Sequence, residues 1–405
     1  MTAALDRHFA LSRPSRLGVA VSGGSDSLAL LHLLHDWARV PLAAVTVDHG
    51  LRPNSAGEAA HVAAICDGLG IPHSVLKWQG WDGRGNLQDQ ARRTRYSMMA
   101  DWAREAGLSA VALGHTQDDQ AETFLLRLSR QAGLEGLSAM RPRVTHYGMA
   151  FDRPMLALAR NDLRTYLTER GVRWVEDPSN EDAAFERVRV RQALEVLATL
   201  GLDTASVATS VKYLQDADEA LAVVTNRYAE DKVTSVAGDL IFDRTDLRRQ
   251  PHDIMRRLLA GGLRWVASAD YAPRKAPLAE AMNQVIEGEN TALHGCRVLV
   301  SGMTVRIARE LAAVSGVVTP TDRPWDGRWR LDGPHAPDLE VRALGEAVNE
   351  CPNWRETGLP RASLLSSPAV WRGDRLVAAP VAGLNNGWTA QTRDAGDFAT
   401  SLIVH

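Results

Sequence analysis

Short apolar runs alternate with helical patterns through the first part of the chain. Apolar and β-branched runs predict buried strands at residues 17–21, 40–48, 73–78 and 110–113. Apolar residues at helical spacing, such as Leu28, Leu31 and Leu34, predict helices between these strands. Strands that alternate with helices in this way predict an α/β fold with a doubly wound parallel sheet.

The pattern changes after residue 200. Helical patterns cover residues 204–231, 247–266 and 278–287. Two β-hairpins are predicted further on, one at 293–308 turning at Ser301-Gly302 and one turning at Gly373-Asp374. We therefore predict three domains: the α/β domain at 1–200, a mainly helical domain at 201–315 and a small C-terminal α+β domain at 316–405.

The composition indicates an ordinary globular protein and argues against several kinds of site. The chain has 405 residues, of which 45% are hydrophobic and 23% charged, as in ordinary globular proteins. We expect no signal peptide and no membrane span, because no apolar run is long enough. The three cysteines form no CxxC pair, so we expect neither a zinc knuckle nor an iron–sulfur site, and a reducing cytoplasm fits. The net charge of −3 means that a nucleic acid would have to be bound by local basic patches.

The first predicted strand is followed by a loop with the sequence SGGSDS, residues 22–27, and then by a helix. Two glycines let the backbone approach an anion closely, and the helix dipole attracts negative charge. The loop is neither a Walker loop, since it has no lysine, nor a GxGxxG turn. Asp26 is an unusual neighbour for phosphate unless it holds Mg²⁺. The alternative is an ordinary Gly-Ser turn capped by Asp26.

Polar residues also follow two other predicted strands. Asp48 and His49 end one strand, where a nucleotide site and a simple turn are equally good interpretations. His115, Asp119 and Glu122 follow another, and the spacing of the two acids puts them on one helix face, where they could share a divalent cation. Acidic residues in a first turn can also just satisfy the helix dipole.

Arginines mark candidate contacts to RNA. Arg92 and Arg95 share a helix face, which could equally be a solvated face, and Arg187 to Arg191 open a later helix. Residues 323–330 interleave arginines with Trp325 and Trp329, a pattern that suits base stacking but equally suits the core and exposed face of a small β-domain.

Six motifs in the first half of the chain resemble those of the tRNA(Ile)-lysidine synthases, which belong to the PP-loop ATP pyrophosphatases. In order, they are SGGSDS, VDHGLR, NLQDQARRTRY, GHTQDDQAET, RPML and EDPSNEDAAFERVRVR. The chain departs from the family pattern at Thr116, where a second His is common, in the loop SRQAG, and at Val188, where many relatives have Asn. None of these changes removes a carboxylate from the motifs.

The resemblance implies an enzyme that uses ATP to join free L-lysine to C2 of the wobble cytidine (position 34) of the CAU-anticodon isoleucine tRNA. The product would read AUA instead of AUG, and AMP and pyrophosphate would be released. Domain 1–200 would bind ATP, domain 201–315 would bind substrate and domain 316–405 would bind tRNA. The alternatives are another PP-loop tRNA-modifying ligase and an ATP sensor that cleaves nothing. The sequence leaves the oligomeric state open, a homodimer included.

The same resemblance implies roles for single residues. The ATP-binding residues would be Ser22, Gly23, Gly24, Ser25, Asp26, Ser27, Asp48 and His49. The catalytic residues would be Asp26, His115, Asp119 and Glu122, with Asp26 and Asp119 holding Mg²⁺. The tRNA-binding residues would be Arg92, Arg95, Arg187 and Arg191.

Overall fold

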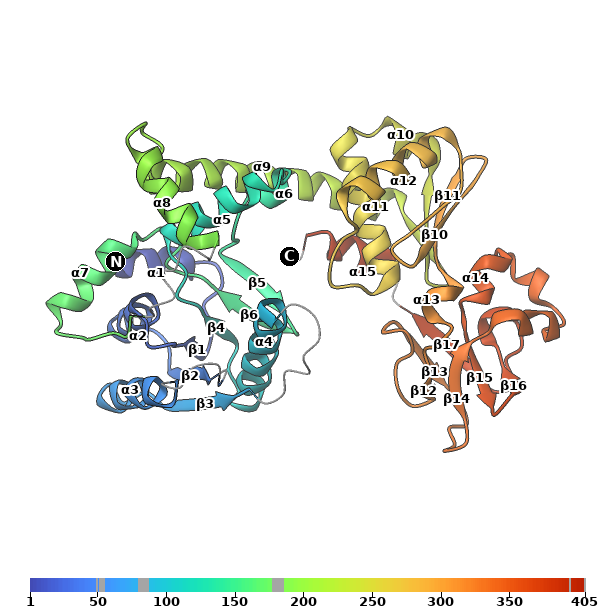
Figure 1. The fold of residues 1–405 in the computed structure, drawn as a ribbon. Coiled ribbons are helices and arrows are strands. Elements are labelled where there is room, and N and C mark those ends of the chain that lie inside the picture. Colours follow the sequence, from blue (N-terminus) through green and yellow to red (C-terminus); the bar gives the residue numbers. More distant parts are fainter. Residues whose placement is uncertain (49, 51–54, 79–86, 177–185, 393–394, 404–405) are drawn as a thin grey trace. The chain divides into compact units, whose positions relative to one another are not determined.

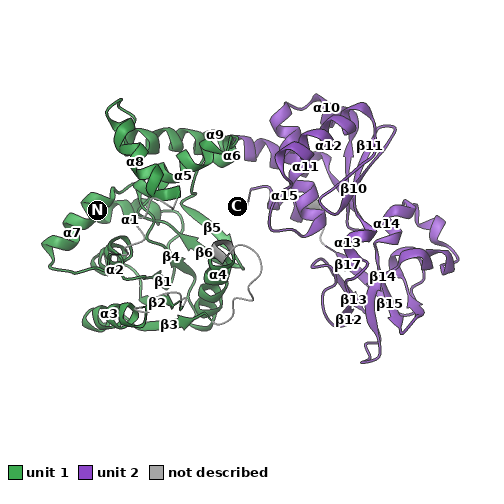
Figure 2. Cartoon of the chain, in the orientation of Figure 1, with its two compact units in different colours: residues 1–218 green, residues 219–405 purple. Residues whose placement is uncertain are grey.

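The computed structural model describes the chain except for residues 49, 51–54, 79–86, 177–185, 393–394 and 404–405 (Figure 1). The described residues form two compact units, 1–218 and 219–405 (Figure 2). The boundary between the units lies within one long helix, α9 (Thr204–Lys232). The division into three domains at residues 200 and 315 stays a prediction.

Unit 1 is built on a six-stranded sheet with the strand order β3-β2-β1-β4-β6-β5. All neighbouring strands are parallel except the edge pair β5 and β6. The strands are β1 (Leu17–Ala20), β2 (Leu42–Asp48), β3 (His73–Lys77), β4 (Ala110–Ala112), β5 (Arg143–His146) and β6 (Met149–Asp152). The helices are α1 (Thr2–His8), α2 (Ser25–Trp37), α3 (Ser55–Gly68), α4 (Leu87–Glu105), α5 (Gln117–Ser129), α6 (Leu134–Leu137), α7 (Arg160–Glu169), α8 (Glu186–Ala198) and the first part of α9. The predicted doubly wound fold is confirmed, with one antiparallel strand added at the edge.

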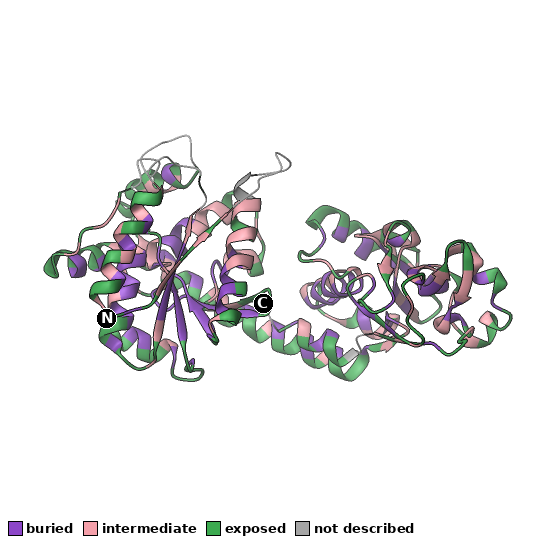
Figure 3. Cartoon of the chain, turned by 90° about the horizontal axis from the view of Figure 1, so that it is seen from below, coloured by how far each residue is buried: buried purple, intermediate pink, exposed green. Residues whose placement is uncertain are grey.

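The two faces of this sheet carry separate hydrophobic cores, because side chains alternate between the faces of a strand. Leu17 and Val19 of β1 pack with α1, α2, α3 and α7 on one face. Val45 of β2 and Val111 of β4 pack with α4 on the other face. In Figure 3 the central strands of this sheet are largely buried, whereas the edge strands β3 and β5 and the outer faces of the helices are more exposed. The sheet is thus held from both sides, and its carboxyl edge is free to carry a site.

The β5–β6 hairpin lies where we predicted no strand. Its turn is Tyr147-Gly148, and both residues have positive φ, 51° and 72°. Two consecutive residues of this kind are typical of the type I′ turn that matches the twist of a hairpin. The turn was not recognised because tyrosine is an uncommon residue at positive φ. Outside the strands, Val175 donates its backbone N–H to the Gly23 carbonyl at 2.9 Å.

Unit 2 contains the rest of α9 and three antiparallel sheets, with strand orders β7-β8-β11-β10-β9, β12-β14-β15-β16 and β13-β17. The strands are β7 (Thr234–Val236), β8 (Asp239–Asp243), β9 (Thr291–Leu293), β10 (Cys296–Ser301), β11 (Thr304–Arg309), β12 (Thr319–Pro320), β13 (Trp329–Asp332), β14 (Glu340–Ala343), β15 (Pro368–Arg372), β16 (Arg375–Ala378) and β17 (Thr389–Thr392). The helices are α10 (Arg244–Arg249), α11 (His252–Ala267), α12 (Lys275–Glu287), α13 (Leu311–Val314), α14 (Arg361–Leu365), α15 (Ala395–Ser401) and the 3₁₀ turns η2 (Gly345–Glu350), η3 (Trp354–Thr357) and η4 (Pro380–Ala382).

Both predicted hairpins of unit 2 are confirmed as β10–β11 and β15–β16. The predicted helix 247–266 is wrong in one respect: it is divided into α10 and α11 at Pro251, whose ring cannot continue a helix from the preceding turn. The C-terminal helix α15 packs Phe398 and Leu402 against α11, so the end of the chain completes the core of the region 233–307. Among the described helices, none combines the length and the low charge needed to cross a bilayer.

The arginine and tryptophan stretch 323–330 lies largely inside unit 2. Trp325 and Trp329 are buried in a core, and their rings cannot stack on bases. Arg328 is buried too, where it donates to Asp326 and to the Gly238 carbonyl. The interpretation of this stretch as a β-domain core is confirmed for these three side chains. Of the three arginines in this stretch, Arg323 and Arg330 are exposed.

Candidate active site

The loop after β1 forms the floor of the site. Gly23 has φ +88°, a conformation that glycine adopts without a Cβ penalty. The loop is closed by Ser27, whose hydroxyl accepts from the Ser22 N–H at 3.1 Å and donates to the Gly24 carbonyl at 2.9 Å. The N-cap residue of α2 is Gly24, which has no side chain to cap the helix. The first-turn N–H groups and the helix dipole therefore favour an anion here.

The end of β4 packs directly on this loop. A Cβ placed on Gly114 would lie 3.0 Å from Ser27 Cα and 3.1 Å from the carbonyl carbon of Asp26. Only glycine allows this approach, since both neighbours are backbone atoms that cannot move aside easily. The contact brings the residues that follow β4 next to the anion-binding loop.

Replacing Gly114 with alanine should therefore push the segment after β4 away from Asp26 and Ser27. We expect unfolding in urea to show a loss of about 1–3 kcal/mol, as for other overpacked sites, and calorimetry to show weaker ATP binding. Gly133→Ala is the matched control, because Gly133 has a negative φ of −79° and open space where a Cβ would lie. Equal ATP affinity in Gly114→Ala and the wild type would contradict this role for the close approach.

Asp119 is fixed at the start of α5 by a reciprocal cap. Thr116 donates both its N–H and its hydroxyl to Asp119 Oδ2, at 2.8 and 2.9 Å. The Asp119 N–H points back to the Thr116 hydroxyl at 3.4 Å. This capping box leaves Oδ1 as the oxygen that faces the site. Thr116 thus has a clear positioning role in this chain.

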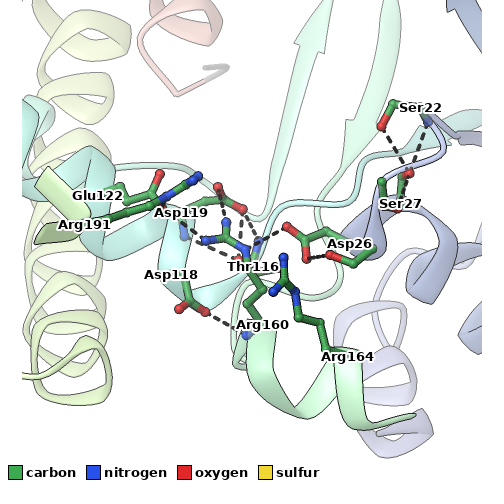
Figure 4. A network of polar contacts seen from close by, with 12 residues as sticks. Ser22, Asp26, Ser27, Thr116, Asp118, Asp119, Glu122, Arg160, Arg164 and Arg191 are labelled. Carbon is green, nitrogen blue, oxygen red and sulfur yellow. Dashed lines mark hydrogen bonds and ion pairs between the residues drawn. The ribbon is translucent and has the colours of Figure 1, made fainter. Parts of the chain in front are cut away.

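Arg160 connects three carboxylates from two helices (Figure 4). Its Nε donates to Asp26 Oδ2 at 3.0 Å, its Nη2 to Asp119 Oδ1 at 3.0 Å and its Nη1 to Glu122 Oε1 at 3.2 Å. Its backbone N–H donates to Asp118 Oδ2 at 2.7 Å. Arg191 of α8 reaches Glu122 Oε1 as well, at 2.6 Å. The carboxylates predicted to form a site are therefore brought together, and one guanidinium lies among them.

The charges in this network are interdependent. Burial raises the pKa of Asp26, and Arg160 offsets only part of that rise. Burial alone would also raise the pKa of Asp119, but Arg160 and the hydrogen bonds from Thr116 outweigh it and hold the pKa below its usual value. The same carboxylates raise the pKa of Arg160, although burial alone would lower it. The guanidinium is thus a permanent positive charge in this pocket.

His115 lies between the acids and a group of arginines. Burial lowers the pKa of His115 to about 3, and Arg153, Arg95 and Arg187 act in the same direction. Its Nδ1 is buried and has no hydrogen-bond partner among the described residues. At neutral pH the imidazole is neutral, so it can offer a hydrogen bond but does not supply a positive charge.

The four arginines predicted to bind tRNA divide into two pairs. Arg95 and Arg191 line the same cavity as the acids, and Arg191 contacts Glu122. Arg92 and Arg187 are exposed on α4 and α8. Arg92 and Arg95 both lie over the ring of Tyr96, at 5.5 and 5.8 Å from its centroid. The exposed pair is free to meet RNA, whereas the lining pair faces whatever occupies the cavity.

The cavity has a volume of about 880 Å³, which suits a nucleotide and a second small group. Its lining includes these predicted residues: Ser22, Gly24, Ser25, Asp26, Ser27, Asp48, Arg95, His115, Asp119 and Arg191. Gly23 and Glu122 are not among the residues that line it, and His49 falls outside the described residues. Asp48 accepts the Gly50 N–H at 2.9 Å, as the turn interpretation expected, and also lines the cavity.

Sequence reasoning missed Arg160, Arg164 and Trp174. Arg160 begins α7, and nothing in the sequence pattern distinguishes it from a surface arginine. One signal could have pointed to a residue such as Arg160. Several carboxylates were predicted to converge at the site, and a partly buried cluster of acids needs a cation. Trp174 and Arg164 line the far side of the cavity, with the guanidinium 5.9 Å from the indole centroid.

The cation that Asp119 and Glu122 share is thus Arg160, part of the chain itself. Among the described residues, no three His, Cys, Asp or Glu side chains are arranged to hold a metal. Asp26 nevertheless fits Mg²⁺, because its carboxylate lines the cavity and, among the described residues, Oδ1 accepts from Ser25 and Oδ2 from Arg160. Asp119 fits less well, since Thr116 and Arg160 already occupy both of its oxygens.

Comparisons with known proteins show the family to which the chain belongs. Residues 1–197 match the family model of the PP-loop domain. The chain is 47% identical over 406 residues to a tRNA(Ile)-lysidine synthase of Ruegeria pomeroyi, covering 99% of this chain and 97% of that protein. It is 33% identical to one of Brucella canis, covering 92% and 87%. A U34-tRNA thiolase structure from Methanococcus maripaludis, at 15% identity and TM-score 0.46, covers 53% of this chain and 77% of that one. The resemblance predicted from the motifs is confirmed, and the chain belongs to the tRNA(Ile)-lysidine synthase family.

Proposed function

We propose that this protein uses ATP to join free lysine to C2 of the wobble cytidine in the CAU-anticodon isoleucine tRNA, so that the tRNA reads AUA instead of AUG. The observation that carries the proposal is the similarity to the Ruegeria pomeroyi protein over nearly the full length of both chains. The glycine loop and the acidic cluster beside it supply the groups that such a reaction needs. A protein that acts on tRNA and ATP would work in the cytoplasm.

The first step activates the base. The C2 oxygen of cytidine attacks the α-phosphorus of ATP, a C2–O–P bond forms, and the bond to the β-phosphate breaks to release pyrophosphate. The amides of the SGGSDS loop and the N-terminus of α2 would hold the phosphates. Neutral His115 would donate or accept a hydrogen bond near the reacting base without adding charge.

The second step introduces lysine. Its ε-amine attacks C2, the C2–O bond breaks, and AMP leaves with the oxygen, while the amine loses its protons to a base. Glu122 is suited to the amine, because its Oε2 is buried and has no hydrogen-bond partner among the described residues. Asp119 would help to hold the ammonium before it loses a proton. The site thus pairs an anion-binding loop for ATP with carboxylates for a cationic substrate.

Mg²⁺ would be held by Asp26 and by the phosphates of ATP, the usual arrangement for this ion. When bound, it would neutralise charge on the phosphates. Arg92 and Arg187 would contact the tRNA backbone from the rim, and Arg95 and Arg191 would contact the part of the anticodon that enters the cavity. A homodimer stays a prediction.

The test is product analysis with purified protein, ATP, Mg²⁺, lysine and tRNA. We expect AMP and pyrophosphate, with AMP accumulating only when both lysine and the CAU-anticodon isoleucine tRNA are present. Lysidine in the digested tRNA should match AMP one to one. ADP and phosphate as products would overturn the PP-loop assignment. ATP binding without any turnover would support an ATP sensor instead.

A further inference from the structure

We propose that Arg160 is a positioning residue for the reaction: an internal cation that fixes the two carboxylates of α5 and the carboxylate of α2 in the orientation that the substrates meet. The inference rests on the proposed function, and it adds to it a residue that the sequence motifs did not single out. Arg160 would act through Asp26, Asp119 and Glu122, and not on the reacting atoms.

The Arg160 guanidinium and its three acceptors, Asp26, Asp119 and Glu122, form an arrangement that we call the fork. Three different guanidinium nitrogens donate to three different carboxylates, at 3.0, 3.0 and 3.2 Å. The Arg160 backbone N–H is itself tied to Asp118, so the start of α7 is fixed to the start of α5. The planar guanidinium has fixed N–H directions, and a lysine ammonium could not reach the same three acceptors from one position.

Burial makes this cation necessary. The side chains of Glu122 and Asp119 are only 1% and 10% exposed, and that of Arg160 is 18% exposed. Carboxylates that are withdrawn from water and close together repel one another strongly unless a cation lies between them. Arg191 can offset the negative charge of Glu122 but not that of Asp26 or Asp119, because it contacts neither aspartate in the described structure. Arg160 forms ion pairs with all three carboxylates, those of Asp26, Asp119 and Glu122.

The charged and titratable groups around Arg160 come from each element packed against it. They are Asp26 on α2, His115 after β4, Asp118, Asp119 and Glu122 on α5, Arg164 on α7 itself, Glu176 before α8 and Arg191 on α8. Acids outnumber arginines in this set, and an incoming ATP adds further negative charge. A fixed guanidinium in the middle allows these acids to stay ionised beside the phosphates.

The fork also determines which oxygen is left for substrate. Glu122 uses Oε1 for both Arg160 and Arg191, and its Oε2 is the buried oxygen without a partner. Asp119 uses Oδ2 for Thr116 and Oδ1 for Arg160. Without Arg160, Thr116 would still hold Asp119 and Arg191 would still hold Glu122, but no described cation would link the two carboxylates. Their repulsion would then change the direction of the free oxygen.

The experiment compares Arg160→Ala and Arg160→Lys with Arg170→Ala, in the full-length protein. Arg170 is the matched control, because it lies at the end of the same helix, pairs with Asp36 and does not line the cavity. Initial rates of lysidine formation are measured against tRNA, lysine and ATP, with and without millimolar guanidinium chloride. Thermal melts are recorded under the same conditions.

For Arg160→Ala we expect kcat to fall by about a hundredfold, while the KM for tRNA stays within about threefold, because most tRNA contacts lie outside this pocket. Guanidinium should restore part of the lost kcat and raise the melting temperature of this variant alone, by filling the space among the carboxylates. Arg160→Lys should keep the fold and recover less than tenfold of the lost rate, since one ammonium cannot replace the fork.

Two results would overturn the proposal. One is a folded Arg160→Ala enzyme with wild-type kcat, which would show that Arg160 only stabilises the fold. The other is a fall in kcat that guanidinium leaves unchanged, together with no rise in melting temperature. If the wild type forms no lysidine, the proposed function fails, but the guanidinium-dependent melting of Arg160→Ala still decides whether the fork is an internal cation site.

Discussion

Replacing Asp26 with asparagine should lower kcat/KM for lysidine formation by about a hundredfold or more, which is about 2.7 kcal/mol of transition-state stabilisation. Asparagine keeps the size of the side chain but removes the negative charge that balances Arg160 and suits Mg²⁺. The melting temperature should not fall. Burial raises the pKa of Asp26, so the folded protein disfavours its ionised form at neutral pH, and the loss of that charge does not reduce stability.

Asp36→Asn provides the matched control, because Asp36 lies on the same helix α2 but away from the cavity. Burial alone would raise the pKa of Asp36, but hydrogen bonds from Tyr166 and Arg170 hold it below its usual value. A lowered pKa means that this carboxylate stabilises the fold above its unfolded pKa and loses that effect in acid. Asp36→Asn should therefore melt earlier at neutral pH and keep its kcat. If Asp26→Asn instead unfolds, and its folded fraction retains full activity, Asp26 has a structural role.

The fold of unit 1 could be predicted from sequence where local patterns and tertiary packing agree. The run 17–21 is apolar because β1 is buried on both faces, and the helix after it begins where the glycines end. The hairpin β5–β6 could not be predicted, because its turn uses Tyr147 at positive φ and its edge strand β5 is half exposed. Edge strands carry a weaker apolar pattern than buried ones, so periodicity alone misses them.

The candidate site, like the fold, contains residues that could be predicted from the sequence and others that could not. Residues that follow a strand, such as Asp26, His115 and Asp119, were predictable because the carboxyl ends of parallel strands converge. Arg160 was not, because its partners lie far away in the sequence and only folding reveals three carboxylates around it. The tryptophans at 325 and 329 illustrate the opposite case: their spacing fits both a core and an RNA surface, and only burial separates the two.

A fragment of residues 1–218 should bind ATP but lose most of its affinity for tRNA, by about a hundredfold or more at physiological salt. The cut belongs after Asp218, since a cut near residue 200 would remove Val207 and Val211, which pack with Ala121 of α5 in unit 1. It would also remove Asp218, the partner of Arg141.

The cavity of unit 1 has room for ATP and one base, which cannot distinguish one tRNA from the many others that have a cytidine. Discrimination needs contacts spread along the RNA, to phosphates, 2′-hydroxyls and splayed bases. Arg248, Arg249, Arg323 and Arg330 of unit 2 are exposed, and they are our candidates for these contacts. Each phosphate contact that is lost should lower the slope of log affinity against log salt by about one unit.

The measurement is ATP binding by calorimetry and tRNA binding by filter assay at several salt concentrations, for the fragment and for the full chain. Substitutions that remove the charges of Arg248 and Arg249 in the full chain test part of this prediction. They should weaken tRNA binding and leave ATP binding unchanged. The prediction would be contradicted by a fragment that modifies the isoleucine tRNA at near full kcat/KM and still rejects the methionine tRNA with the same CAU anticodon. Selection would then lie within unit 1, and its exposed Arg92 and Arg187 would be the residues to change next.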